Sequence, residues 1–295
     1  AVDTIVGNAG ADSITGGAGD DIITGGDGTD TFNVDSGTDI VNDLGGSSGG
    51  ENDIVIISAG ATVNANNIVS FVATSATQNN STDAGNAVLT AKSGAGRTIS
   101  VANATGSSKA FTLVGSDGND SLTGGAGDDI ISVTSAGHAN ADILDGGAGT
   151  DTLVLSSGTH TLTSENKIVN IENINLSTSG SGTNVDLTGQ TEAFTITAGN
   201  FANTIKSGGG ADTIVGGTNV DTITGGAGDD IITGGAGNDI ITIDSGEDKV
   251  KDLGGASGSE QDVVVVNAGA TLNAIDIIGF TATNATKNDS TDANN

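Results

Sequence analysis

A nine-residue pattern recurs in fixed phase along this chain, and it limits the possible folds more than any other feature. From Gly7 the sequence reads GNAGADSIT, GGAGDDIIT, GGDGTDTFN and VDSGTDIVN, with Gly fourth, Asp sixth and an apolar residue eighth in each. A second block begins at Gly115, and a third block of six repeats begins at Ala198. Repetition at a short fixed period predicts a solenoid, in which each repeat packs mainly against its neighbours.

Each repeat is typical of a turn followed by a short strand. Its first six residues place glycine where the backbone adopts positive φ, whereas the last three, such as Ile22, Ile23 and Thr24, have high β-propensity. If two repeats complete one coil, every residue lies next to the residue 18 positions later. Asp12 then stacks on Asp30, and Asp21 stacks on Asp39.

The stacked aspartates predict a cation site between successive turns. Carboxylates at the strand spacing of about 4.8 Å repel one another, and a divalent cation held by two carboxylates and several carbonyl oxygens removes that repulsion. Oxygen ligands without His or Cys favour calcium over zinc. Each repeat offers only one inward apolar side chain, so bound calcium is expected to stabilise the fold. The aspartates predicted to bind calcium are Asp12, Asp21, Asp30, Asp39, Asp120, Asp129, Asp142, Asp151, Asp212, Asp221, Asp230, Asp239 and Asp248.

These blocks resemble the repeats-in-toxin (RTX) nonapeptide GGxGxDxUx, which forms a calcium-binding parallel β-roll in secreted bacterial proteins. The resemblance implies that each site combines the aspartates of two stacked turns with main-chain carbonyl groups of both. The turn with Gly17, Gly19 and Asp21 would face Val34, Ser36 and Asp39, and the turn with Gly226, Gly228 and Asp230 would face Ile243, Ser245 and Asp248. Gly235 and Gly237 belong to the same implied ligand set.

A much longer repeat encloses the short one. Residues 3–86 align without a gap with residues 212–295, at an offset of 209, and about 50 of the 84 pairs are identical. The second copy stops partway through its unit. We therefore interpret the chain as a window from a longer tandem array.

The expected fold is all-β, with parallel β-roll blocks joined by β-solenoid or β-sandwich-like spacers. Segments Asp53–Thr77 and Ala87–Val114 read as short Val, Ile and Thr strands, whereas Thr152–Lys206 has evenly spaced apolar triplets that resemble rungs of a wider β-helix. More loosely, that last pattern resembles segments of bacterial surface-layer proteins. The predicted parts are a first roll (1–44), a β-rich spacer (45–114), a second roll (115–155), a β-helix-like spacer (156–197), a third roll (198–253) and a truncated second copy of the spacer (254–295).

The charge of the chain argues against two classes of partner. A net charge of -29 at pH 7 repels phosphate backbones and anionic lipids, and no apolar stretch is long enough to cross a membrane. We therefore expect neither nucleic acid binding nor direct membrane insertion. The chain also has no Cys, so disulfides cannot stabilise it.

Catalysis is not expected. The segment Gly45–Gly49 (GGSSG) fits a GxSxG nucleophile pattern, but the second copy has Ala256 where Ser47 stands. Both histidines, His138 and His160, are expected in loops or on the surface. Acidic residues outside the nine-residue frame are expected on solvated surface and not in calcium sites; among them are Glu51, Asp53, Glu165 and Asp262.

Tandem 209-residue units are typical of a rod-forming structural protein. The tandem repeat favours a structural protein that builds a surface layer, filament or adhesin stalk, and the RTX resemblance implies an extracellular or cell-surface bacterial protein that is secreted by a type I route, with its signal outside this segment. Its expected partners are neighbouring repeats or further copies of itself. The alternative is the calcium-dependent RTX tail of a type I secreted enzyme or toxin.

Overall fold

The computed structural model describes residues 1–47, 49–81, 85, 87–133, 142–164, 167–176, 180–253, 260–275 and 287–288. The chain divides into two compact units, one of residues 1–153 with 169–171 and one of residues 154–168 with 172–295. Strands are the only regular elements of any length in the described ranges. No helix that could cross a membrane occurs in them.

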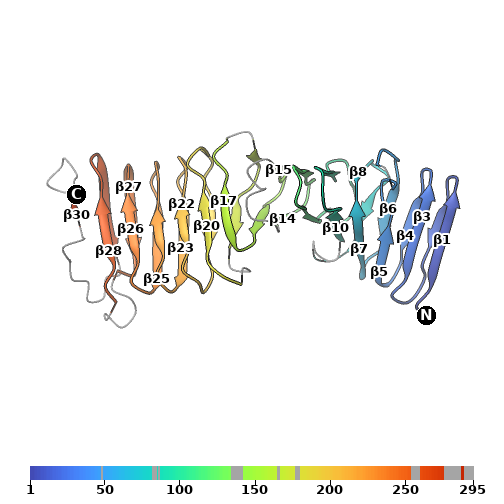
Figure 1. Ribbon diagram of the computed structural model, residues 1–295, viewed down its shortest axis with the longest axis horizontal. Helices are drawn as coiled ribbons and strands as arrows, with labels where there is room; N and C mark the ends of the chain where they lie inside the picture. Colours follow the sequence, from blue (N-terminus) through green and yellow to red (C-terminus); the bar gives the residue numbers. More distant parts are fainter. Residues whose placement is uncertain are drawn as a thin grey trace. The chain divides into compact units, whose positions relative to one another are not determined.

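The strands of the first unit belong to parallel sheets whose neighbours follow one another in sequence order (Figure 1). One sheet contains β1 (Thr4–Ala9), β3 (Ile22–Asp27), β5 (Gly37–Asn42), β7 (Ala61–Ile68), β10 (Ala87–Ala91), β12 (Thr112–Val114) and β14 (Ile130–Val133). A second contains β2 (Ser13–Thr15), β4 (Thr31–Val34), β6 (Ile54–Ile57) and β9 (Gln78–Asn79). A third contains β8 (Ser70–Val72), β11 (Thr98–Ser100), β13 (Ser121–Thr123) and β15 (Ile143–Asp145).

The second unit is built in the same way, from two parallel sheets. One contains β19 (Asn173–Asn175), β21 (Thr195–Thr197), β23 (Thr213–Thr218), β25 (Ile231–Ala236), β27 (Gly246–Lys251) and β29 (Ala270–Ile275). The other contains β17 (Gly158–Thr161), β20 (Thr183–Asp186), β22 (Thr204–Lys206), β24 (Thr222–Thr224), β26 (Ile240–Ile243), β28 (Val263–Val266) and β30 (Lys287–Asn288). Two short strands, β16 (Thr152–Leu155) and β18 (Ile168–Val169), contain the points at which the units divide.

The strand register confirms the predicted coil of two repeats. Thr4 lies opposite Ile22, and Ile22 lies opposite Ile40, so neighbouring strands of the first block are 18 residues apart. The third block has the same register, with Thr213 opposite Ile231. Parallel pairing at this spacing places each turn directly on the turn of the next coil.

The spacers continue the solenoid instead of forming a sandwich. Leu89 of β10 pairs with Leu113 of β12, and Val185 of β20 pairs with Ile205 of β22, both in parallel register. These coils need 24 and 20 residues, so they differ from the rolls in circumference and not in architecture. Of the two alternatives that the sequence left open for the spacers, the described strands show the β-solenoid.

The core consists of rows of inward side chains that stack from one coil to the next. Ile196, Ile214, Ile232 and Val250 form one such row and are all fully buried. The residues on either side of each inward position face outward, as the alternation of a strand requires. Each coil therefore buries little apolar area except against the coils above and below it.

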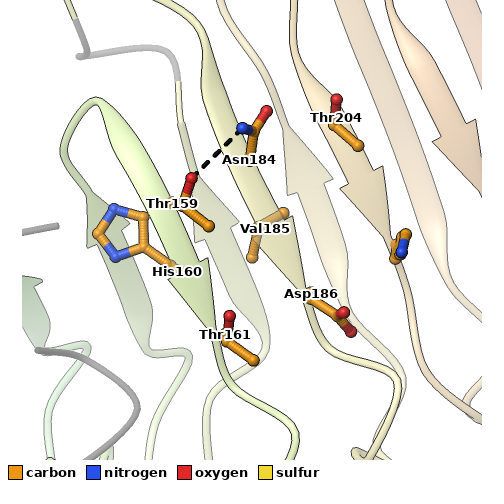
Figure 2. Close-up of a pocket in the computed structure, with 8 residues that line it drawn as sticks. Thr159, His160, Thr161, Asn184, Val185, Asp186 and Thr204 are labelled. Carbon is orange, nitrogen blue, oxygen red and sulfur yellow. Dashed lines mark hydrogen bonds between the residues drawn. The ribbon is translucent and has the colours of Figure 1, made fainter. Parts of the chain in front are cut away.

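His160 occupies one of these inward positions. It pairs with Val185 in a row that continues to Ile205, and it is fully buried, so the expectation of a surface or loop histidine was wrong. Figure 2 shows its ring on the opposite side of β17 from Thr159 and Thr161. Its Nε2 lies 2.8 Å from the carbonyl oxygen of Ser156, whereas Nδ1 has no hydrogen-bond partner. The other histidine, His138, lies outside the described residues.

Burial lowers the pKa of His160, because the charged imidazolium loses its hydration. A lowered pKa in the folded state means that stability is present above the unfolded pKa of about 6.5 and is lost as the pH falls. Replacing His160 with Leu removes this dependence. We expect the stability of His160→Leu to rise relative to that of the unaltered protein as the pH falls from about 7.5 to about 5.5, because only the unaltered protein loses stability in this window. Denaturant unfolding in saturating calcium measures it, with Val185→Leu as a pH-independent control; a constant difference would contradict the assignment.

Candidate calcium-binding site

Turns of the first and third rolls adopt the positive φ that their glycines predict. Gly17 and Gly19 have φ of 88° and 135°, and Gly226 and Gly228 have φ of 92° and 126°. Residues other than glycine rarely adopt such values. The chain then enters the next strand, with the sixth-position aspartate at the junction of turn and strand. This position directs each carboxylate toward the turn.

Stacked aspartates form two ladders in each roll. The main-chain N–H of one aspartate donates a hydrogen bond to the Oδ1 atom of the aspartate in the next coil. These N–O distances are 3.0 Å for Asp21 to Asp39, 2.9 Å for Asp12 to Asp30, 2.9 Å for Asp230 to Asp248 and 2.8 Å for Asp221 to Asp239. Asp212 donates to Asp230 in the same way. The predicted contacts of residues 18 apart are therefore present.

The second block keeps its ladders across an insertion. Asp120 donates to Asp142 and Asp129 donates to Asp151, at 2.7 Å each, although both pairs are 22 residues apart. Residues 134–141 of the insertion lie outside the described ranges. The insertion does not change which aspartates stack.

Two further aspartates belong to the ladders, which corrects the expectation that they lie on solvated surface. Asp30 donates to Asp53 at 2.8 Å, and Asp239 donates to Asp262 at 2.9 Å, both across 23 residues. Asp53 and Asp262 are almost fully buried. Five inserted residues shift them out of the nine-residue count, yet each stands directly before an apolar strand, as the other ladder aspartates do. That local context was the signal in the sequence. Glu165, by contrast, lies outside the described residues.

The second carboxylate oxygens of the ladders show that a cation fits here. Eight ladder aspartates have an Oδ2 atom that is buried and has no hydrogen-bond partner. They are Asp12, Asp21, Asp30, Asp39, Asp221, Asp230, Asp239 and Asp248. A buried carboxylate oxygen without a partner is costly unless a positive charge neutralises it. Oxygen donors alone are what calcium prefers. The residues present therefore suit calcium.

Some ladder aspartates satisfy Oδ2 within their own turn. Oδ2 of Asp129 accepts a hydrogen bond of 2.6 Å from the N–H of Gly125, and Oδ2 of Asp120 accepts one of the same length from Ser116. The Ser207 hydroxyl donates to Oδ2 of Asp212. These contacts show where Oδ2 points, which is into the turn that precedes its own strand.

Burial also raises the pKa of the ladder carboxylates, because the charged form loses hydration. The pKa rises to about 7 for Asp129, Asp221 and Asp230, and to about 6 for Asp239 and Asp248. The charge of a stacked neighbour acts in the same direction, for example that of Asp248 on Asp230. Near neutral pH, without a cation, these groups are close to their titration points.

The main chains of successive turns are in contact. Isolated parallel β-bridges join Ala18 to Ser36 and Ala227 to Ser245. The turns that the RTX resemblance predicts to share a site are therefore in contact. The Gly226 carbonyl accepts a hydrogen bond of 3.2 Å from the N–H of Ser245. Within the described residues no three acidic or histidine side chains converge on one point. A cation between these turns would thus be held by two carboxylates together with carbonyl oxygens.

The comparison with protein families identifies the repeats. A family model described as "RTX calcium-binding nonapeptide repeat (4 copies)" matches residues 2–32, 112–133, 134–159, 195–223 and 215–250. The chain carries RTX calcium-binding repeats. No curated protein matches the chain as a relative. RTX repeats bind calcium and typify secreted, extracellular bacterial proteins. The ladders support the calcium binding independently, whereas the extracellular location rests on the family match.

In these RTX turns the chain's own residues position the ligands. The ladder hydrogen bonds fix Oδ1 of each aspartate, and the glycine at the first turn position makes room for Oδ2. A Cβ atom on Gly225 or Gly234 would clash with Oδ2 of Asp230 or Asp239. When bound, calcium would supply the positive charge that these buried oxygens lack.

Glycine at the second RTX position is required for the approach of successive coils. Gly235 has a φ of 95°, and a Cβ atom there would clash with the carbonyl oxygen of Gly217 in the preceding coil. Gly269 has a similar φ of 91°, but a Cβ atom there meets nothing within 4 Å. We expect Gly269→Ala to destabilise the fold by about 1 kcal/mol through backbone strain alone, and Gly235→Ala by about 3 kcal/mol or more. Thermal unfolding in calcium compares them; equal losses would mean that the carbonyl contact is unimportant.

Proposed function

We propose that the chain is part of an extracellular, calcium-stabilised structural protein that builds a surface layer, filament or adhesin stalk from tandem repeats. One observation carries the proposal. The partial second copy of the 209-residue unit repeats the strand register of the first, because Gly37 pairs with Ala61 in the first copy and Gly246 pairs with Ala270 in the second. Repetition in sequence is therefore repetition of the same coils.

A solenoid with a recurring unit is suited to a load-bearing role. Each coil pairs with the next through parallel strands, so further units add coils without changing the ones present. In this proposal the partners are neighbouring repeats or further copies of the chain, joined head to tail, because such contacts propagate and do not close. Calcium lowers the repulsion within a chain of net charge -29 and between its neighbours.

The proposed role is structural, without catalysis, nucleic acid binding or membrane insertion by this segment. We also propose that the protein is secreted by a type I route, with a signal elsewhere in the protein. The same RTX repeats would also suit the calcium-dependent tail of a secreted enzyme or toxin. An experiment on several consecutive units distinguishes the two.

Small-angle scattering and electron microscopy of a chain with one, two and four copies of the unit 3–211 test the proposal. In about 1 mM calcium we expect stiff particles whose length rises in proportion to the copy number. In excess chelator the same chains should be expanded coils. If calcium-loaded chains are flexible beads with uncorrelated orientations, the structural role is wrong and the secreted tail is the better account.

A further inference from the structure

Asn203 stands in one of the two ladders of the third roll, at a position where the later repeats of the roll have aspartate. Its N–H donates to Oδ1 of Asp221 at 2.7 Å, and its own Oδ1 accepts the N–H of Thr183 at 3.0 Å. Asp221 donates to Asp239 in the same way. Asn203 is almost fully buried, so it extends the ladder by one coil without adding a carboxylate.

The side-chain amide of Asn203 donates two hydrogen bonds. Nδ2 donates to the main-chain carbonyl of Phe201, in the turn that precedes β22, and to Oδ1 of Asp221 at 3.0 Å. Because Oδ1 of Asn203 has the same role as Oδ1 of the ladder aspartates, Nδ2 corresponds to their Oδ2. That Oδ2 is buried and has no partner in Asp221 and Asp239. In Asn203 a donor with partners stands at the same place.

The two partners of this amide are oxygens of the kinds that a calcium ion takes in an RTX turn. One is a carboxylate oxygen of the stacked coil, and the other is a main-chain carbonyl oxygen. Phe201 is the fourth residue of its repeat, as Gly228 is in the turn of Asp230, and the RTX resemblance implies a carbonyl ligand at that position. The amide hydrogens therefore meet oxygens that a cation would meet elsewhere in the roll.

The ladder has no charged side chain on the other side of Asn203. The coil before it has Thr183 at the ladder position, so the stacked carboxylates of this ladder begin at Asp221. A carboxylate buried at position 203 would need a cation, because a buried charge is costly unless it is neutralised. A neutral amide closes this end of the ladder with hydrogen bonds alone.

The other ladder of the third roll ends with protein donors too. In the coil before Asp212 the ladder position is occupied by Phe194, which is buried and whose N–H donates to Oδ1 of Asp212 at 2.7 Å. The Ser207 hydroxyl donates to Oδ2 of Asp212. Asn203 and Ser207 stand directly before and after β22, so this one coil supplies the closing donors of both ladders.

We propose that Asn203 sets where calcium binding starts in the third roll, because its side-chain amide takes the place of a cation between the turns that carry Asn203 and Asp221. The first cation of this ladder then lies between the turns that carry Asp221 and Asp239. The coil that joins the spacer to the roll needs no calcium ion of its own in this ladder. Asn203 is thus a specificity-determining residue of the calcium sites: an amide at this position excludes the cation, and a carboxylate admits it.

Asn203→Asp tests this directly, because the substitution keeps the side-chain shape and replaces the donor with an acceptor. Equilibrium dialysis of the whole chain with radioactive calcium should show one calcium ion more than the unaltered chain binds, since two stacked carboxylates would then face each other above Asp221. Asn200→Asp is the matched control. Asn200 is in the same turn and the change of charge is identical, but its side chain is exposed. This control should bind the same number of ions as the unaltered chain.

Thermal unfolding at low and saturating calcium provides a second measurement. The midpoint of Asn203→Asp should rise more steeply with calcium than that of the unaltered chain, because one more ion binds the folded state. Unchanged stoichiometry, or a midpoint lowered equally at both concentrations, would overturn the proposal, since the new charge would then be buried without a cation. A gain of one ion in Asn200→Asp would also overturn it, because any added charge in this turn would suffice. Neither measurement involves assembly, so the proposed structural role does not depend on the outcome.

Discussion

Removal of calcium with excess chelator is expected to abolish most of the β-sheet circular dichroism of this protein. Without a cation the first and third rolls hold stacked carboxylates whose Oδ2 atoms are buried and unpaired, as in Asp230 and Asp248. Each coil buries little apolar area except against its neighbours, so the loss spreads along the stack. Adding back about 1 mM calcium should restore the signal, and magnesium at the same concentration should not, because it releases its water ligands reluctantly.

Acid should partly replace calcium in the chelator experiment. The raised pKa of Asp221 and Asp230, about 7 in the folded state against about 4 when unfolded, means that the folded chain without calcium is most stable below the unfolded pKa. That stability is lost as the pH rises from about 4 to about 7. A β-sheet signal that persists in excess chelator at neutral pH would contradict the role given to calcium.

Asp230→Asn should have opposite effects with and without calcium. Asn keeps the oxygen that accepts the N–H of Asp212, at 2.9 Å, but loses the charge that binds the cation. In calcium we expect a loss of about 2–4 kcal/mol of unfolding free energy, the stabilisation that a bound ligand provides at 100 to 1,000 times its Kd. In chelator the variant should be at least as stable as the unaltered chain, because one buried charge has gone.

Asp229→Asn is the matched control for this prediction. Asp229 is the adjacent residue in the same turn, but it is exposed and its Oδ1 accepts the N–H of Glu247 at 2.9 Å. The charge change is identical, so only the position in the ladder differs. We expect an effect below about 0.5 kcal/mol in either condition. Asp262 cannot serve as such a control, since it belongs to the ladder. Equal effects of the two substitutions in calcium would show that the ladder position has no special role.

The regular part of the fold was predictable because one short period sets it. The constant spacing of Gly, Asp and Ile predicts both the coil of two repeats and the stacking of Asp12 on Asp30. Side chains that recur every 18 residues must align in a parallel solenoid, whatever the composition of the rest. The ladder contacts followed without knowledge of any other contact.

The sequence predictions failed where the number of residues per coil changes but the parallel pairing of the strands continues. Asp53 and Asp262 seemed to lie outside the pattern because inserted residues in the loop alter the spacing, whereas the strand that follows restores the register. His160 resembled a surface residue, since nothing local in its strand distinguishes it; only its pairing with Val185 reveals an inward position. Pairing across coils of unequal length is a tertiary property, which a fixed sequence period does not contain.

The central claim is that calcium ions lie between stacked turns and bind the unpaired Oδ2 atoms of the ladders. X-ray diffraction from crystals grown in calcium, at a wavelength with a measurable anomalous signal from calcium, tests it most directly. The account predicts anomalous peaks between the turns that carry Asp21 and Asp39, and between those that carry Asp230 and Asp248, with carboxylate and carbonyl oxygens at about 2.3–2.6 Å from each peak. Turns without anomalous density, with these Oδ2 atoms hydrogen-bonded to water or to protein donors, would contradict it.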